Sequence, residues 1–361
     1  MPALVAIATR KGLWLASDTG SGWELSDRLL GMNAVYSVAI DTRGAVPRLL
    51  AGVDSEHWGP SVMTSDDLGR TWQEPEDAPV RFPERTGTSL TRVWQLQPAP
   101  ASQPDVVWAG TQPSALFRSE DGGRSFSFVD GLWDHPHRPE WGEGYGGQAV
   151  HTILPHPVEP DRVLVAMSTG GVYRSADRGK SWTAANRGIS AAFLPEPEPE
   201  FGQCVHKVAF SPGRPEQLFA QNHGGVFRSD DEGTTWAPID DGLPASFGFP
   251  VVAHPHRPGT AYVFPLVADM DRRPADGRCR VFRTDDAGAT WRSTSAGLPD
   301  EPHFGGVVLR DAMSTDGGVP AGVYFGNRNG EVYASRDEGE SWSVVARHLP
   351  DVLCVRAAVL A

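Results

Sequence analysis

The sequence predicts an all-β protein, a seven-bladed β-propeller with four-stranded blades. One eight-residue pattern occurs six times, its copies lie 51 to 56 residues apart, and short apolar runs separated by Gly and Pro fill the intervals. A period of about 50 residues matches one four-stranded blade and exceeds the length of most helical repeats. The two chain ends together supply strands for one more blade, so the predicted ring has seven.

The repeated pattern is Ser/Thr-x-Asp-x-Gly-x-Ser/Thr-aromatic, which we call the box. An Asp side chain accepts hydrogen bonds from backbone N–H groups just ahead of it, and Gly allows a positive φ, so each box is expected to close a tight turn. The aromatic residue then packs against a neighbouring sheet. We predict that the box aspartates are structural. They are Asp67, Asp121, Asp177, Asp231, Asp286 and Asp337.

Apolar runs around each box predict the four strands of a blade. The box at 229–236 gives the clearest case. Its strands are expected at 205–210, 217–221, 225–228 and 235–239. The first strands of the other five repeats are expected to begin near Ala34, Arg92, Ala149, Pro250 and Gly305.

The chain ends contain the parts of one further blade. Residues 4–8 and 12–16 resemble second and third strands, and 17–23 resembles a shortened box that leads into a fourth strand. The apolar run 352–360 is the missing first strand. We therefore predict one propeller domain over residues 1–361, closed by pairing of the two ends, which removes an exposed sheet edge.

The box resembles the Asp-box, or bacterial neuraminidase repeat, of sialidases and many other β-propellers. Six copies in register, five of them ending in Trp, carry the resemblance. It implies that the boxes join third and fourth strands at the periphery, away from a central ligand site, and that the protein is sialidase-like or glycosyl-hydrolase-like. The Phe-Arg-Ile-Pro-like segment that sialidases carry before the first box has no counterpart at the start of this chain. Arg10, Arg92 and Arg328 could form a sialidase-like carboxylate clamp, and Tyr36 with Glu56 a nucleophile pair, although nothing in their spacing requires either.

Charge and cysteine content narrow the possible partners. The formal net charge is −13 and no Lys/Arg cluster offsets it, so a nucleic-acid partner is not expected. No apolar run approaches the ~20 residues of a membrane-spanning helix, and the N-terminus lacks the features of a signal peptide. Three scattered cysteines are too few for a disulfide framework or a tetrahedral zinc site, which favours a cytoplasmic location.

The inner ends of the predicted first strands carry polar side chains, which indicates a solvated channel mouth where a ligand binds. Two adjacent repeats share a Gln-x-x-His pattern there. We predict His151 and His206 as catalytic candidates. The predicted ligand-binding residues are Tyr36, Arg92, Trp94, Gln148, Gln203, Asn222, His223 and His57. Alternatively, the two histidines only stabilise a solvated channel through hydrogen bonds.

Three functions remain open at this stage. In the first, the protein binds a small polar molecule or glycan, carbohydrate-like or carboxylate-bearing, at a channel mouth that includes the insertion 133–145. Hydrolysis of that ligand is one version of this function. In the second, His151 and His206, with His223 or His57, hold a divalent metal ion for lyase or hydrolase chemistry. In the third, the propeller binds a protein partner without catalysis, as the resemblance to the photosystem II assembly factor and to sorting-receptor propellers implies. No other cofactor is predicted.

Overall fold

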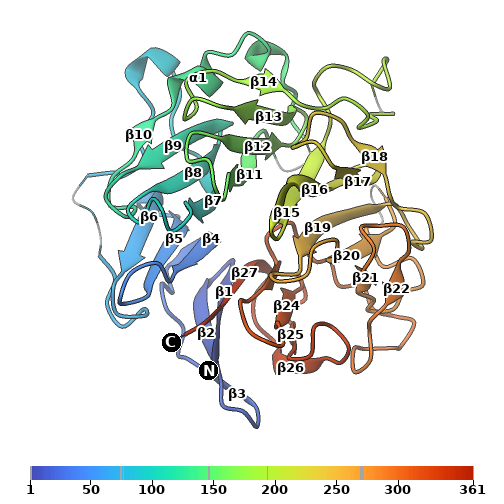
Figure 1. Cartoon of the computed structure of the whole chain (residues 1–361). Coiled ribbons are helices and arrows are strands. Elements are labelled where there is room, and N and C mark those ends of the chain that lie inside the picture. Colours follow the sequence, from blue (N-terminus) through green and yellow to red (C-terminus); the bar gives the residue numbers. More distant parts are fainter. Residues whose placement is uncertain are drawn as a thin grey trace.

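The computed structural model describes residues 2–73, 75, 77–144, 147–192, 194–268 and 272–360. Seven antiparallel sheets lie around a central axis, with the two chain ends close together (Figure 1). The predicted seven-bladed propeller is confirmed. None of the described helices has the length and apolar composition that crossing a membrane requires.

The sheets are numbered as blades from the N-terminus, and each is given from its innermost strand outward. Blade 1 consists of β27 (Val352–Val359), β1 (Ala3–Thr9), β2 (Gly12–Asp18) and β3 (Trp23–Leu25), and blade 2 consists of β4 (Asn33–Asp41), β5 (Arg48–Ser55) and β6 (Gly59–Ser65). Blade 3 consists of β7 (Arg92–Pro98), β8 (Val107–Gln112), β9 (Ala115–Ser119) and β10 (Ser127–Phe128), and blade 4 consists of β11 (Val150–Pro155), β12 (Val163–Met167), β13 (Gly171–Ser175) and β14 (Thr183–Ala184).

Blade 5 consists of β15 (Val205–Ser211), β16 (Arg214–Asn222), β17 (Gly225–Ser229) and β18 (Ala237–Pro238). Blade 6 consists of β19 (Phe247–Ala253), β20 (Ala261–Leu266), β21 (Phe282–Thr284) and β22 (Arg292–Ser293). Blade 7 consists of β23 (Met313–Thr315), β24 (Val323–Gly326), β25 (Val332–Ser335) and β26 (Ser343–Ala346). The short helices are η1 (Glu84–Thr86), α1 (Asp130–Trp133) and η2 (Arg138–Glu140). In blade 2 the place of the fourth strand holds a single bridge, Thr64 to Gln73; Glu74 and Glu76 lie outside the described residues.

The two chain ends close the ring. Strand β27 pairs antiparallel with β1, from Ala3 opposite Val359 to Thr9 opposite Val352. Each innermost strand also contacts the innermost strands of both neighbouring blades. The predicted completion of blade 1 by the C-terminal strand is confirmed, and in Figure 1 the red β27 lies beside the blue β1.

Each of the six boxes forms the same type of turn, with the same set of hydrogen bonds. In the box of blade 4, the Ser175 hydroxyl donates to Asp177 Oδ1 (2.8 Å) and accepts from the backbone N–H of Gly179 (2.7 Å). Asp177 also accepts from the backbone N–H and the hydroxyl of Ser181 (2.9 and 2.5 Å). Positive φ values occur at the box glycine and at the residue before it, so the backbone makes a double left-handed turn.

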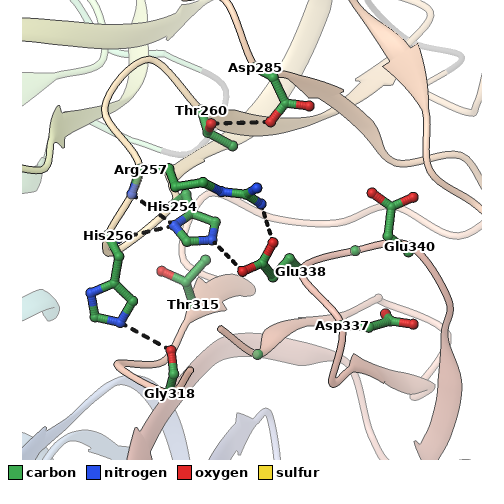
Figure 2. A network of polar contacts seen from close by, with 12 residues as sticks. His254, His256, Arg257, Thr260, Asp285, Thr315, Gly318, Asp337, Glu338 and Glu340 are labelled. Atoms are coloured by element: carbon green, nitrogen blue, oxygen red, sulfur yellow. Dashed lines mark hydrogen bonds and ion pairs between the residues drawn. The ribbon is translucent and has the colours of Figure 1, made fainter. Parts of the chain in front are cut away.

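Box residues also join neighbouring blades. The indole N–H of Trp236, Trp291 and Trp342 donates to a carbonyl of the preceding blade, at 2.6 to 2.9 Å. At the outer rim between blades 6 and 7, the box residue Glu338 contacts Arg257 and lies 3.4 Å from His254 Nε2 (Figure 2). The boxes therefore stabilise both their own hairpin and the packing of blade on blade.

The start of blade 7 differs from the prediction. A first strand was expected near Gly305, but β23 begins at Met313. Two consecutive glycines, Gly305 and Gly306, disfavour a strand there. The segment that follows runs irregularly along the channel and forms a bridge between Asp311 and Cys354 of β27. This eight-residue displacement changes which side chains of blade 7 face the centre.

Candidate functional site

A cavity of about 1030 Å³ opens at the centre of the ring. Its wall comes from the beginnings of the innermost strands and from the loops between second and third strands, the two regions expected to share one face. The lining residues are Arg10, Tyr36, Arg92, Trp94, Gln112, Gly144, Gly147, Ser168, Thr169, Cys204, His206, His223, Phe249, Arg272, Leu309, Arg310, Asp311, Arg328 and Leu353.

The cavity wall is cationic although the whole chain is acidic. Five arginines line it, against one carboxylate among the described lining residues, that of Asp311. The chain as a whole has a net charge of −13. A concave wall of one sign concentrates ligands of the opposite charge. The charge of this wall therefore favours an anionic ligand over a cationic one.

Arg92 and Arg310 both approach the ring of Trp94. Their guanidinium carbons lie 5.7 and 5.4 Å from its ring centre. Neither has a carboxylate within ion-pair distance among the described residues, and the buried Nε of each has no hydrogen-bond partner there. Burial lowers the pKa of Arg310, which reflects the cost of placing this charge inside the ring.

Polar contacts fix Trp94 and Arg92. Gln112 Oε1 accepts from the indole N–H of Trp94 at 3.0 Å and from Arg92 at 3.4 Å. The guanidinium of Arg92 also stacks 4.2 Å from the ring centre of Tyr36. Indole, phenol and guanidinium thus form a preorganised wall.

Arg10 and Arg328 are partly neutralised. Asp351 Oδ2 accepts from Arg10 Nε at 3.3 Å and from Arg328 Nη2 at 2.8 Å. Arg10 also donates to the Tyr36 hydroxyl at 3.3 Å. The three arginines considered as a clamp from the sequence, Arg10, Arg92 and Arg328, therefore all reach the cavity.

Asp311 is held by two cations, the buried Lys207 and the half-buried Arg356. Lys207 Nζ lies 2.8 Å from its Oδ1, and Arg356 binds the same carboxylate. Burial alone would raise the pKa of Asp311, but the charges of Lys207 and Arg356 outweigh it and the pKa is lowered. Burial and, to a lesser extent, the charge of Arg356 lower the pKa of Lys207, and the opposing effect of Asp311 does not fully offset them. This triad ties β15, the segment before β23 and β27 together.

Cys204, His206 and His223 form the opposite part of the wall. Their potential ligand atoms all lie within 4.8 Å of one another. His206 packs on the ring of Phe249, with ring centres 5.0 Å apart. Burial, then the charge of Arg310, lowers the pKa of His206 well below its ordinary value, so the imidazole is neutral near pH 7.

The predicted site residues divide into two groups. Tyr36, Arg92, Trp94, His206 and His223 line the cavity. His151 lies behind that wall, where its Nε2 is 3.1 Å from the lining hydroxyl of Ser168. Burial, then the charge of Arg310, keeps the pKa of His151 well below its ordinary value. A catalytic role for either histidine stays a prediction.

The repeated glutamines bind loops. Gln148 Nε2 donates to the carbonyl of Trp141 (2.9 Å), and Gln203 Nε2 donates to that of Pro199 (2.6 Å). Asn222 is buried and donates to the carbonyl of Ser190 (3.0 Å). None of these three side chains is among the described lining residues. In this structure each one holds the loop that leads into the channel.

Two predicted parts of the rim lie elsewhere. His57 is exposed on the loop between β5 and β6 and is absent from the described cavity wall. The two tryptophans of the insertion 133–145 pack away from the described cavity wall: Trp133 packs on Phe82 and Phe128, and Trp141 donates to the Tyr173 hydroxyl at 2.9 Å. Of the insertion's described residues only Gly144 lines the cavity, and Tyr145 lies outside the described residues.

Several lining residues escaped the sequence analysis. Arg310 and Asp311 were missed because the first strand of blade 7 was placed eight residues early. Their signal is a charged pair inside an otherwise apolar run, 306–313. Cys204 stands between Gln203 and His206, where alternation along a strand puts it on the face of His206.

Comparisons with known proteins support the propeller and point to carbohydrate-active relatives. No family model matches this chain. The chain is 24% identical over 282 residues to the xyloglucanase Xgh74A of Acetivibrio thermocellus, which covers 66% of this chain and 31% of the relative. A second match, at 27% identity over 242 residues, is a xyloglucanase of Hypocrea jecorina. The chain thus spans about a quarter to a third of the length of these relatives.

Solved structures show the same fold at low identity. An ancestral GH74 enzyme superposes with a TM-score of 0.61 at 17% identity, covering 87% of this chain and 38% of that one. YCF48 bound to a D1 peptide superposes with a TM-score of 0.52 at 16% identity, covering 88% and 82%. At these identities the likeness establishes the β-propeller fold alone.

Proposed function

We propose that this protein binds a carboxylate-bearing carbohydrate in its central cavity. The observation that carries the proposal is the pair of guanidinium groups at Arg92 and Arg310. Both lie beside Trp94 and have no carboxylate partner among the described residues. Both side chains are half-buried. Partial burial of a cation costs free energy unless an anion offsets it, and a ligand carboxylate supplies that anion.

The neighbouring side chains suit a sugar ring. Trp94, Tyr36 and Phe249 offer apolar faces for stacking, while Gln112 and Ser168 offer groups that bind hydroxyls. The relatives named as xyloglucanases support a carbohydrate ligand. Arg92 and Arg310 favour an acidic sugar over a neutral one.

Calorimetric titration tests the proposal on the full chain. Oligogalacturonate should bind at moderate salt, and a neutral xyloglucan oligosaccharide should bind at least about 10-fold more weakly. Arg310→Gln and Arg92→Gln should each reduce affinity for the acidic sugar at least about 10-fold, because a hydrogen bond to a charged group contributes about 1.5–3 kcal/mol. Arg214→Gln, on the exposed surface of β16, is the matched control and should leave affinity unchanged.

Three results would contradict the proposal. Equal binding of the neutral sugar would remove the role of the carboxylate. Unchanged affinity in both arginine variants would move the site elsewhere. Tighter binding of an acidic peptide than of any acidic sugar would replace the carbohydrate by a protein partner. Product analysis of the same mixtures tests whether binding is followed by hydrolysis.

A further inference from the structure

Blade 5 brings three metal-ligating side chains to the cavity wall. Cys204 immediately precedes β15, His206 lies in it, and His223 follows β16. The two strands pair with Val205 opposite Asn222, and the backbone N–H of His223 donates to the carbonyl of Cys204 at 2.9 Å. Strand pairing therefore fixes the spacing of the three side chains, whose potential ligand atoms lie within 4.8 Å of one another.

The hydrogen bond of His206 leaves the correct nitrogen available. Its Nδ1 lies 2.5 Å from the carbonyl oxygen of Gly248. Because a carbonyl only accepts, Nδ1 carries the proton and Nε2 carries the lone pair. Metal-ligating histidines are commonly oriented in this way, with the second ring nitrogen donating to a carbonyl or carboxylate.

The distance between the first two ligand atoms suits a tetrahedral zinc ion. His206 Nε2 lies 3.5 Å from Cys204 Sγ. Zinc bonds of about 2.3 Å to sulfur and 2.0–2.1 Å to nitrogen, at a tetrahedral angle, place the two atoms about 3.5 Å apart. We propose that Cys204, His206 and His223 form a zinc-type site whose fourth position faces the cavity.

Two other histidines, His156 and His254, have the opposite arrangement. His156 lies near Glu159 and Glu232, but its Nδ1 accepts from the backbone N–H groups of Val158 and Glu159 (3.3 and 2.9 Å). His254 Nδ1 likewise accepts from His256 and Arg257 (3.0 and 3.1 Å), and its Nε2 points at Glu338 (Figure 2). In both, Nε2 carries the proton and cannot ligate a metal in that tautomer. Among the histidines compared, the arrangement of His206 is the one suited to a metal.

The donor atoms and the nearby charges define which metal ion the site would bind. A cysteine and two histidines form a soft donor set that suits zinc and its cobalt(II) substitute and does not suit calcium or magnesium. Arg310 and Arg272 line the same cavity and oppose a free dication. A metal-bound thiolate offsets one of the ion's charges, and three protein ligands leave one position for water or a ligand oxygen.

Cobalt(II) alone tests this inference, independently of any sugar. The untagged, reduced full chain should bind one equivalent of Co²⁺ and show a thiolate-to-cobalt charge-transfer absorption. Cys204→Ser should abolish that absorption and weaken binding more than about 100-fold, beyond the 10–100-fold typical of losing an outer hydrogen-bond partner. His223→Gln should weaken binding while the thiolate absorption is reduced or lost.

Matched variants control for other sites and for misfolding. Cys279→Ser removes a different buried cysteine, and His156→Gln removes the histidine that lies near Glu159 and Glu232. Both variants should bind Co²⁺ as the parent does. Thermal unfolding of each apo variant verifies that it is folded. Absence of Co²⁺ binding by the parent, or a thiolate absorption that survives in Cys204→Ser, would overturn the proposal and leave a plain thiol–imidazole hydrogen bond.

Discussion

The outer boxes and the central cavity are built from the same repeats in opposite ways. Six boxes, from Asp67 to Asp337, make the same hydrogen bonds to within a few tenths of an ångström. At the centre, equivalent parts of the blades carry three different side chains, the phenol of Tyr36, the indole of Trp94 and the imidazole of His206. Repetition at the rim thus stabilises the ring, and divergence at the hub gives the central cavity its particular lining.

Removing the hub strand that closes the ring should have the largest effect. Deletion of residues 351–361 removes β27 and the buried side chains Val352, Leu353 and Val355. Each contributes about 1.5–3 kcal/mol, so the free energy of unfolding should fall by about 4.5–9 kcal/mol. We expect a chain that fails to fold or melts at least about 10 °C lower by circular dichroism. Deletion of residues 360–361 alone is the control; a full deletion that melts like the parent would exclude closure by β27.

Breaking the hub's ion triad should have the next largest effect. Asp311→Asn leaves the buried Lys207 and the half-buried Arg356 beside each other without their carboxylate. Loss of one partner of a buried pair costs about 3–5 kcal/mol. Chemical denaturation should measure this loss against Asp241→Asn, an exposed carboxylate that should change stability little. A loss below about 1 kcal/mol would mean that water already screens the triad.

A single box should matter less, and only to stability. Asp177→Ala removes the bonds to Ser175 and Ser181 in one of six equivalent turns. Because the turn is exposed and screened, we expect a loss of about 1–2 kcal/mol with unchanged affinity for the acidic sugar. Arg310→Gln should do the reverse, lowering affinity without lowering stability. If the box variant lost affinity instead, rim and hub would be coupled.

Acid should reveal the boxes through a small, gradual effect. The hydroxyl and then the backbone N–H of Thr71 lower the pKa of Asp67 to about 2, and those of Ser181 act likewise on Asp177. Since these pKa values lie below the unfolded value of about 3.9, the ionised boxes stabilise the fold above pH 4. That contribution is lost as the pH falls toward 2.

Melting temperatures measured from pH 5 to pH 2 test this dependence. The parent should lose stability steadily across the interval. Asp177→Asn, which cannot ionise at that position, should start lower and show a shallower slope. Identical slopes for the two proteins would mean that the box carboxylates contribute nothing through ionisation.

The rim could be predicted because its determinants are local. Ser175, Asp177, Gly179 and Ser181 lie within seven residues and bond mainly to one another, so spacing alone revealed the turn and, by counting, the blades. The hub could not be predicted in the same way. Gln148 and Gln203 share a pattern with His151 and His206, yet their amides bind loop carbonyls.

By itself, the sequence determined the repeat, the number of blades and the pairing of the chain ends, because hydrogen bonds between near neighbours and the period of apolar strands are written along the chain. The tertiary structure alone decided that Arg92 and Arg310 meet at Trp94, and that Cys204 faces His206 and His223. Those contacts join different blades or opposite strands. The geometry of these contacts depends on strand register. In blade 7, the eight-residue displacement of the first strand hid the position of Arg310 from the sequence.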